Sequence, residues 1–309
     1  MKTFDAAATC KALQFGPLIA ALDQMFIAGC SVPPRQVHTV GDGVQSLVMP
    51  AWTAGEGRPY YGVKIVNVAA GNRARGLPGL FATYQLFDGV TGEQLALIDG
   101  NEITSRRTAA ASALAAARLA RADARVLLVL GTGRVGSVLP HAYLAVRALE
   151  RILVWDRDAA KARALASELA SSGLPARAAP DLERAVREAD IVSAATAATE
   201  PLVLGAWLAA GSHLDLIGSY MPSMREADDA CVRDCDLWVD TPEAVGKSGD
   251  LTQPIASGAL SRDDVKGTLE TLCRGDVRPG TRARRTVFKS VGTALEDLAA
   301  AILVYESQP

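Results

Sequence analysis

The sequence has few aromatic residues, few histidines and no long apolar run, and each shortage narrows the possible functions. Phe, Trp and Tyr make up 5% of the 309 residues, and there are only three histidines. No stretch approaches the ~20 apolar residues that span a bilayer, and the N-terminal residues lack the pattern of a secretory leader. The net charge of −2 provides no general attraction to nucleic acid or to an anionic membrane. We therefore expect neither partner.

Cysteine is also scarce. The five cysteines are odd in number and scattered, which is typical of reduced thiols and not of a disulfide framework. Reduced thiols are typical of the cytoplasm, so we expect a cytoplasmic protein. With so few histidines, no metal site is expected. Apolar residues make up 49% and charged residues 21%, a composition typical of globular domains. The length allows two of them.

The first third of the chain mixes helical and β-rich patterns. Residues 3–30 carry an amphipathic helical pattern that closes at Gly29. Residues 37–99 hold short runs of β-forming residues between Gly, Pro and Asp turn signals, which predicts an antiparallel, meander-like sheet. Residues 104–120 return to a helical pattern.

From residue 124 onward, apolar strand patterns alternate with helical ones, beginning with a buried strand at 125–130. Such alternation predicts a parallel sheet with right-handed crossovers. The last helical pattern, 291–305, is expected to pack back on the first domain. The fold class is therefore α/β: a doubly wound, Rossmann-type parallel-sheet domain over 121–289, and an α+β domain formed by 1–120 with 290–309.

A glycine-rich turn follows the first strand of the predicted Rossmann domain. In a G-x-G-x-x-G turn, the first glycine permits a tight turn and the second lets the backbone approach a pyrophosphate. The third lets helix and strand pack closely. The diphosphate then lies at the helix N-terminus, where free N–H groups favour anions. The residues predicted to bind a dinucleotide are Gly131, Thr132, Gly133, Arg134, Val135 and Gly136.

Asp156 ends the next strand, close to the ~20-residue offset of a ribose-binding acid. A carboxylate at this position accepts hydrogen bonds from both ribose hydroxyls and repels a 2′-phosphate, which slightly favours NAD. Arg157 follows directly and is suited to pair with a 2′-phosphate, so the cofactor is predicted to be NAD or NADP.

Three cationic residues of the first domain lie in otherwise apolar surroundings. Lys64 lies within a β-like run, Arg107 begins a helix rich in small residues, and Arg35 follows two prolines. Taken singly, each is more typical of an exposed surface charge. The alternative is that they bind an anionic substrate.

Several segments spread along the chain carry a family resemblance. They include Pro33-Pro34-Arg35, Val63-Lys64-Ile65-Val66-Asn67, Arg107-Thr108-Ala109-Ala110, the Gly131 loop, and Phe288-Lys289-Ser290-Val291-Gly292. Together they resemble the ornithine cyclodeaminase/mu-crystallin family. The resemblance implies a homodimer whose first domain forms both the dimer interface and a substrate-facing sheet.

The same resemblance implies roles for individual residues. Arg35, Lys64 and Arg107 are expected to converge on a substrate carboxylate, for which guanidinium and ammonium donors are suited. Lys64 is also suited to relay a proton, since burial lowers the pKa of a lysine. The residues expected near the nicotinamide are Thr108, Lys289, Ser290 and Gly292.

Members of this family include ornithine cyclodeaminases, cyclic imino acid reductases, alanine dehydrogenases and a ketimine-reducing lens protein. Cyclodeaminases carry two acids, which activate the amine or water chemistry and hold the substrate ammonium. At those positions this sequence has Tyr220 and Leu47. A site without these acids suits a flat, anionic imine better than a cationic diamino acid.

The leading hypothesis is an NAD(P)H-dependent oxidoreductase acting on C–N bonds. It would reduce Δ1-pyrroline-2-carboxylate to L-proline, with Δ1-piperideine-2-carboxylate to L-pipecolate as a second reaction. One methylene in an apolar pocket is worth only ~1–3 kcal/mol, so both rings remain open. The alternatives are ornithine cyclodeaminase, an alanine-type amino-acid dehydrogenase, and a non-catalytic cofactor- or ligand-binding protein. In each case the partner is a small anionic imino acid or amino acid.

Overall fold

The computed structural model describes residues 1–53, 57–276 and 284–307, which form two compact units. Unit 1 comprises Met1–Thr108 and Thr293–Pro309, and unit 2 comprises Ala109–Gly292. The division falls within helix α3 (Gly100–Leu119), earlier than the boundary expected after residue 120. Within the described ranges, no helix has both the length and the hydrophobicity that crossing a membrane requires.

Within the described residues, unit 1 is built on a seven-stranded sheet. Its strands are β1 (Lys2–Phe4), β2 (Cys30–Ser31), β3 (Gln36–Gly41), β4 (Val44–Thr53), β5 (Tyr60–Ala69), β6 (Leu80–Asp88) and β7 (Gln94–Asp99). The order is β1-β7-β6-β5-β4-β2, and β3 pairs with β4. Strands β4 to β7 form the predicted antiparallel meander. The short β1, which the sequence pattern did not predict, joins β7 in parallel.

The helices of unit 1 correct one prediction. In place of one helical segment over 3–30, the chain forms β1 and two helices, because Pro17 lies where a continuous helix would need a backbone N–H. The second helix restarts at Phe15, so Pro17 falls in its first turn, and it ends before Gly29 at a φ of 77°. The helical elements confined to this unit are α1 (Ala6–Ala12), α2 (Phe15–Ala28), the 3-10 turn η1 (Ala70–Arg75) and α11 (Ala294–Glu306).

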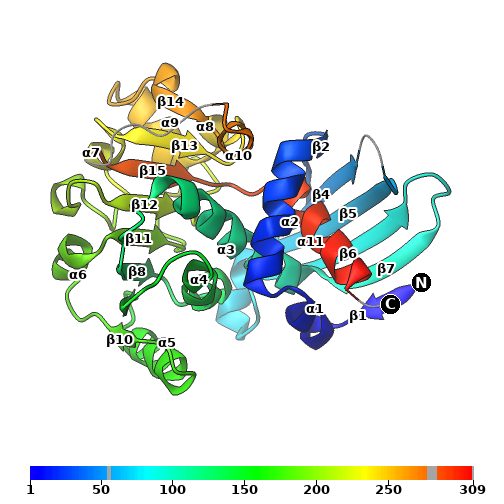
Figure 1. Ribbon diagram of the computed structural model, residues 1–309, viewed down its shortest axis with the longest axis horizontal. Coiled ribbons are helices and arrows are strands. Elements are labelled where there is room, and N and C mark those ends of the chain that lie inside the picture. Colours follow the sequence, from blue (N-terminus) through cyan, green and yellow to red (C-terminus); the bar gives the residue numbers. More distant parts are fainter. Residues whose placement is uncertain (54–56, 277–283, 308–309) are drawn as a thin grey trace. The chain divides into compact units, whose positions relative to one another are not determined.

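Helices α2 and α11 lie side by side against one face of the sheet (Figure 1). Strand β5 shows the consequence, because alternate side chains of a strand point to opposite faces. Gly62, Lys64 and Val66 are buried, whereas Ile65 and Asn67 are exposed. A lysine is therefore placed on the buried, helix-covered face.

Unit 2 contains the predicted parallel sheet, whose described part has eight strands in the order β10-β9-β8-β11-β12-β15-β13-β14. All of its strand pairs are parallel. The strands are β8 (Val126–Leu130), β9 (Arg151–Trp155), β10 (Ala176–Ala178), β11 (Ile191–Ala194), β12 (His213–Leu216), β13 (Asp236–Val239), β14 (Val265–Thr268) and β15 (Thr286–Lys289). Strands β10, β13, β14 and β15 were not predicted.

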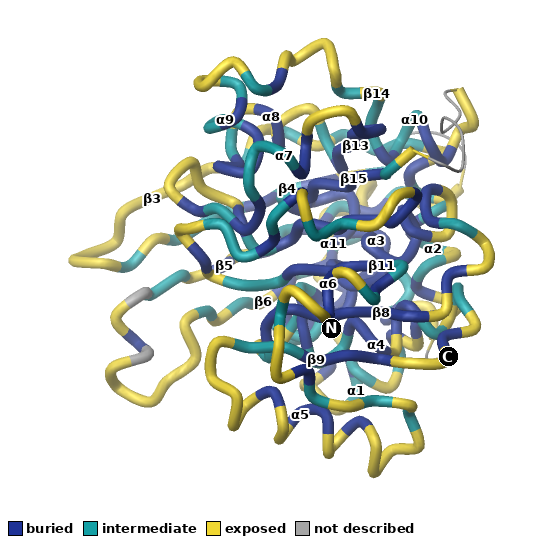
Figure 2. The backbone as a smooth tube through the Cα atoms, turned by 90° about the vertical axis from the view of Figure 1, so that its left-hand side faces the viewer, coloured by how far each residue is buried: buried dark blue, intermediate teal, exposed yellow. Residues whose placement is uncertain are grey.

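The helices that follow these strands complete the doubly wound unit. They are α4 (Arg134–Leu144), α5 (Ala159–Ser171), α6 (Leu182–Glu188), α7 (Asp229–Val232), α8 (Ala244–Lys247), α9 (Gly249–Ala256) and α10 (Leu269–Arg274), with 3-10 turns η2 (Gly205–Trp207) and η3 (Arg262–Asp264). Helix α5 exposes its outer side, whereas β8 and β11 are buried throughout (Figure 2).

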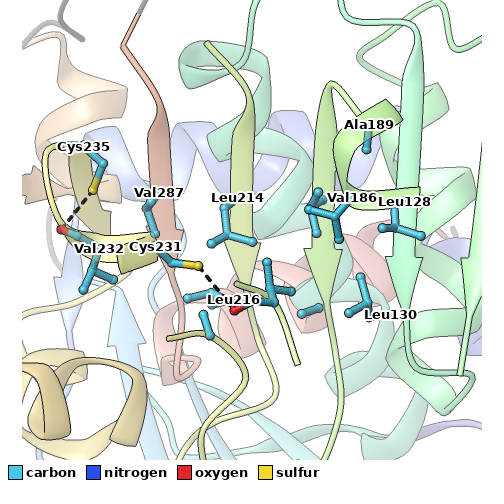
Figure 3. Packing of buried hydrophobic residues seen from close by; sticks show 14 of the residues in the cluster. Leu128, Leu130, Val186, Ala189, Leu214, Leu216, Cys231, Val232, Cys235 and Val287 are labelled. Atoms are coloured by element: carbon cyan, nitrogen blue, oxygen red, sulfur yellow. Dashed lines mark hydrogen bonds between the residues drawn. The ribbon is translucent and has the colours of Figure 1, made fainter. Parts of the chain in front are cut away.

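The core of unit 2 lies between the sheet and its helices. Leu128 and Leu130 of β8 and Leu214 and Leu216 of β12 belong to the cluster in Figure 3, and each is at most 1% exposed. At ~1.5–3 kcal/mol per buried leucine, this cluster fixes the strand ends from which the loops of the candidate site leave.

Candidate functional site

The glycine-rich turn of unit 2 joins β8 to α4, as predicted. Gly131 has a φ of 96°, and an added Cβ would lie 2.5 Å from the Ala195 carbonyl oxygen. A Cβ on Gly136 would lie 2.0 Å from the Gly131 carbonyl oxygen, so helix and turn pack too closely for any side chain. Around Gly133, an added Cβ would meet no described atom within 4 Å. This open backbone at the start of α4 fits the approach of a diphosphate.

The position of this turn in the sheet also supports the binding of a diphosphate. From β8 the chain builds outward through β9 and β10, and then continues on the other side through β11 and β12. The turn after β8 therefore meets the loop after β11 at Ala195. In doubly wound sheets, ligands bind at the carboxyl ends of the strands at such a switch point.

Asp156 directly follows β9 and is joined to the glycine-rich turn. Its Oδ2 accepts hydrogen bonds from Thr132 N (3.1 Å) and Thr132 Oγ1 (2.8 Å), and its Oδ1 accepts one from Asp158 N (2.9 Å). Partial burial acts to raise the pKa of this carboxyl, but these hydrogen bonds outweigh it and lower the pKa. Asp156 is thus ionised at neutral pH, and Arg157 beside it is exposed.

A buried polar network lies at the ends of β12 and β15. Glu226 accepts hydrogen bonds from Thr196 N (2.7 Å) and Gly218 N (2.6 Å), which ties together the loops after β11 and β12. Lys289 donates to the Leu216 carbonyl (3.0 Å), and its Nζ lies 3.3 Å from Asp250 Oδ2. Burial raises the pKa of Glu226 to about 7. The network holds the backbone of these loops in place.

The residues predicted near the nicotinamide are buried or constrained. Thr108 donates to the Thr104 carbonyl within α3 (2.7 Å), and Ser290 N donates to the Leu216 carbonyl (3.1 Å). Gly292 has a φ of 76°, and its N–H donates to Asp240 Oδ2 (2.6 Å). Their proximity to a cofactor stays a prediction.

Unit 1 contains a cluster of four buried charges. Lys64 Nζ of β5 lies 2.6 Å from the carboxylate of Asp297 in α11. Arg107 of α3 donates from Nε to Asp297 (2.9 Å) and from Nη1 to Glu296 Oε2 (2.6 Å). Lys64 is 1% exposed, and both acids are 0% exposed. The structure therefore places two of the three predicted substrate-binding cations on one shared carboxylate.

Both cations have hydrogen-bond donors to spare. Among the described residues, the Lys64 ammonium contacts Asp297 alone, and the hydrogen bonds of Arg107 use Nε and Nη1 and leave Nη2 unused. Burial lowers the pKa of Lys64 to about 8, against the opposing charge of Asp297. This pair is therefore suited to bind an anion, and Lys64 is suited to exchange a proton near neutral pH.

Sequence comparison identifies the family. A model of the ornithine cyclodeaminase/mu-crystallin family matches residues 6–308. The chain belongs to this family. A Δ1-pyrroline-2-carboxylate reductase of Paracoccus denitrificans is 42% identical over 280 residues, which are 87% of this chain and 86% of the relative.

Two solved structures of this kind are similar over almost the whole chain. The Δ1-pyrroline-2-carboxylate reductase of Thermococcus litoralis, in complex with NADH and L-proline, is 30% identical with a TM-score of 0.94, covering 99% of this chain and 97% of its own. An archaeal alanine dehydrogenase dimer with bound NAD is 26% identical with a TM-score of 0.92, covering 99% and 95%. The two-domain α/β fold of this family member is thereby confirmed.

Other residues singled out in the sequence have distinct positions. Arg35 lies between β2 and β3 and is partly exposed, unlike Lys64 and Arg107. Leu47 lies in β4, and Tyr220, in the loop after β12, is 44% exposed. Arg35 and Leu47 belong to unit 1 and Tyr220 belongs to unit 2. Their roles stay predictions.

Sequence reasoning missed Glu296 and Asp297. The signal was present: two adjacent acids at the start of an otherwise apolar helix, where a carboxylate is unexpected unless a buried cation needs it. Asp250 and Glu226 were given no role by the sequence either.

Proposed function

We propose that this chain is an NAD(P)H-dependent oxidoreductase that reduces Δ1-pyrroline-2-carboxylate to L-proline, with Δ1-piperideine-2-carboxylate as a second substrate. The observation that carries the proposal is the buried pair of Lys64 and Arg107 on Asp297, each with unused donors. The similarity to two Δ1-pyrroline-2-carboxylate reductases supports it.

The unused donors match the substrate carboxylate. Arg107 Nη2 and the free ammonium protons of Lys64 supply charge-assisted hydrogen bonds, which are about twice as strong as neutral ones. Because Asp297 and Glu296 already fix the guanidinium plane, little side-chain entropy is lost when the anion binds.

The reaction requires a hydride at the imine carbon and a proton at the nitrogen. When bound, the reduced nicotinamide supplies the hydride. Lys64, with its pKa near 8, holds a proton at neutral pH and donates it toward the substrate, directly or through water. The C=N bond is reduced to a C–N bond, and the cofactor is oxidised by the same two electrons.

The decisive experiment mixes the purified protein with Δ1-pyrroline-2-carboxylate and NADH or NADPH and follows the loss of nicotinamide absorbance. Parallel reactions hold ornithine with NAD, and pyruvate with ammonia and NADH. We expect rapid oxidation with the imine and formation of proline. Proline and ammonia from ornithine alone, or ammonia-dependent oxidation with pyruvate alone, would contradict the proposal.

The cofactor preference is proposed to depend on Asp156. Replacing Asp156 with serine removes the carboxylate that repels a 2′-phosphate, so we expect kcat/KM with NADPH to rise relative to NADH by about tenfold or more. The matched control is Asp158→Ser, because a serine keeps the N-terminal cap of α5 that Asp158 provides and leaves Asp156 in place. An unchanged cofactor ratio in Asp156→Ser would show that another group selects the ribose.

We also propose that the chain forms a homodimer through the uncovered face of its antiparallel sheet. On this face Trp52, Ile65 and Phe81 are 40–44% exposed on three adjacent strands. Exposed apolar side chains gathered on one sheet face are typical of an interface, and a two-fold axis would pair this face with its own copy. The dimeric state of the similar alanine dehydrogenase supports this assignment.

Replacing both Ile65 and Phe81 with aspartate is expected to convert the dimer to a monomer, because four buried charges would face one another across the axis. Size-exclusion chromatography with light scattering measures the mass. The control, Val90→Asp, adds a charge at a residue that is 77% exposed in the turn after β6 and leaves the dimer intact. A wild-type protein that is monomeric at micromolar concentration would refute the dimer.

A further inference from the structure

The two acids that begin α11 make different contacts. Asp297 contacts both Lys64 (2.6 Å) and Arg107 (2.9 Å), whereas Glu296 accepts a hydrogen bond from Arg107 (2.6 Å). Among the described residues, Asp297 provides the one hydrogen-bond acceptor for Lys64. Both acids are fully buried in the same helical turn, so they form a natural matched pair.

We infer that Asp297 is a positioning residue that holds Lys64 and Arg107 at a fixed separation and keeps Lys64 in its charged form, whereas Glu296 orients Arg107 alone. The part of this inference that concerns the substrate rests on the proposed function. The part that concerns Lys64 is a property of the folded protein itself.

The structure gives Asp297 a rigid support. Helix α11 is capped by the Thr293 side chain and buries nine of its residues, including both acids. It packs against β5, which carries Lys64 in the interior of the sheet between β4 and β6. The N-terminal turn of a helix also stabilises a negative charge. Asp297 is therefore held as an anion at a fixed point above the strand.

The balance of charges around Lys64 explains why Asp297 matters. Burial has the largest effect and lowers the pKa of Lys64; Asp297 raises it, Arg107 lowers it again, and Glu296 raises it with the smallest effect of these groups. The cross-strand neighbours are Met49, which does not titrate, and Tyr84, whose pKa is raised well above its usual value by burial and by Asp297, so that Tyr84 stays neutral. Without Asp297, burial and Arg107 would both favour a neutral amine.

The test is a direct titration of Lys64 by NMR in protein labelled with ¹³C at lysine Cε, with Lys64→Arg to assign the signal. Asp297→Asn and Glu296→Gln each remove one buried negative charge without changing the size of the side chain. We expect the titration midpoint of Lys64 to fall by about one pH unit or more in Asp297→Asn, and by clearly less in Glu296→Gln. The basic limb of kcat/KM for imine reduction should move with the midpoint.

Equal midpoints in the wild-type protein and Asp297→Asn, or equal shifts in both variants, would overturn the inference. If the midpoint falls in Asp297→Asn but the wild-type protein reduces no imine, the positioning role stands and the proposed function fails. If Asp297→Asn does not fold, Asp297→Glu serves instead. Its retained charge should preserve the basic limb while the displaced carboxylate raises KM; a limb moved to lower pH would count against the inference.

Discussion

Replacing Lys64 with methionine is expected to lower kcat/KM for imine reduction by about 10²–10⁴-fold, the range for loss of a positioned proton donor. The substitution also removes a charged hydrogen bond to the substrate carboxylate, so KM rises together with the fall in kcat. Stability changes less than the ~3–5 kcal/mol typical of a broken buried pair, because Arg107 still neutralises Asp297. Steady-state kinetics and urea unfolding separate the two effects.

The pH profile gives this prediction a second measurement. Since Lys64 acts in its protonated form, wild-type kcat/KM should fall as the pH rises through about 8, the pKa of Lys64. Lys64→Met should lack this basic limb. Lys11→Met, which changes an exposed lysine at the end of α1, is the control and should retain the wild-type profile. If Lys64→Met keeps the basic limb of the pH profile unchanged, another group titrates there and the prediction is wrong.

The second large effect is expected in the glycine-rich turn, where two substitutions should separate folding from binding. Gly136→Ala places a Cβ 2.0 Å from a backbone oxygen, and should lower the free energy of unfolding by about 1–3 kcal/mol or more, as overpacking does. Gly133 has an extended conformation (φ −73°, ψ −175°) with open space around it. Gly133→Ala should therefore change stability by less than about 1 kcal/mol.

Gly133→Ala should affect cofactor binding much more than it affects stability. A methyl group at the start of α4 occupies the space through which the backbone approaches a pyrophosphate, so the Kd for NADH should rise about tenfold or more. Fluorescence titration measures Kd, and thermal unfolding without cofactor measures stability. If a folded Gly133→Ala protein binds NADH with wild-type affinity, the diphosphate does not bind at this turn and the prediction is wrong.

The cofactor half of the candidate site was readable from the sequence because its signals are local. A strand, the glycines from Gly131 to Gly136, a helix and Asp156 all follow one another within a single β-α-β segment. Gly131 and Gly136 meet backbone constraints that can be deduced from the motif. Strands β10 and β13 to β15 escaped prediction, whereas β11 and β12, which are no longer than four residues, were predicted. A run of this length is ambiguous by periodicity alone.

The cluster of buried charges around Lys64 could be predicted from the sequence only in part. The family resemblance pointed to Lys64 and Arg107, yet composition favoured treating each as a surface charge. Nothing local to Lys64 specifies its partner, because Asp297 lies in a helix at the far end of the chain. The first helical segment was also misread, since Pro17 suits the first turn of a second helix as well as it breaks a single one.

The sequence by itself determined the two-part α/β architecture, the dinucleotide-type turn and the family, because periodicity, turn residues and spaced motifs are properties of short stretches. Only the tertiary structure decided which charges meet. The hydrophobic face of α11 and the pleat of β5 bring Asp297 onto Lys64, and burial then makes that pair sensitive to every neighbouring charge. Such pairing depends on how distant elements pack, which no local pattern encodes.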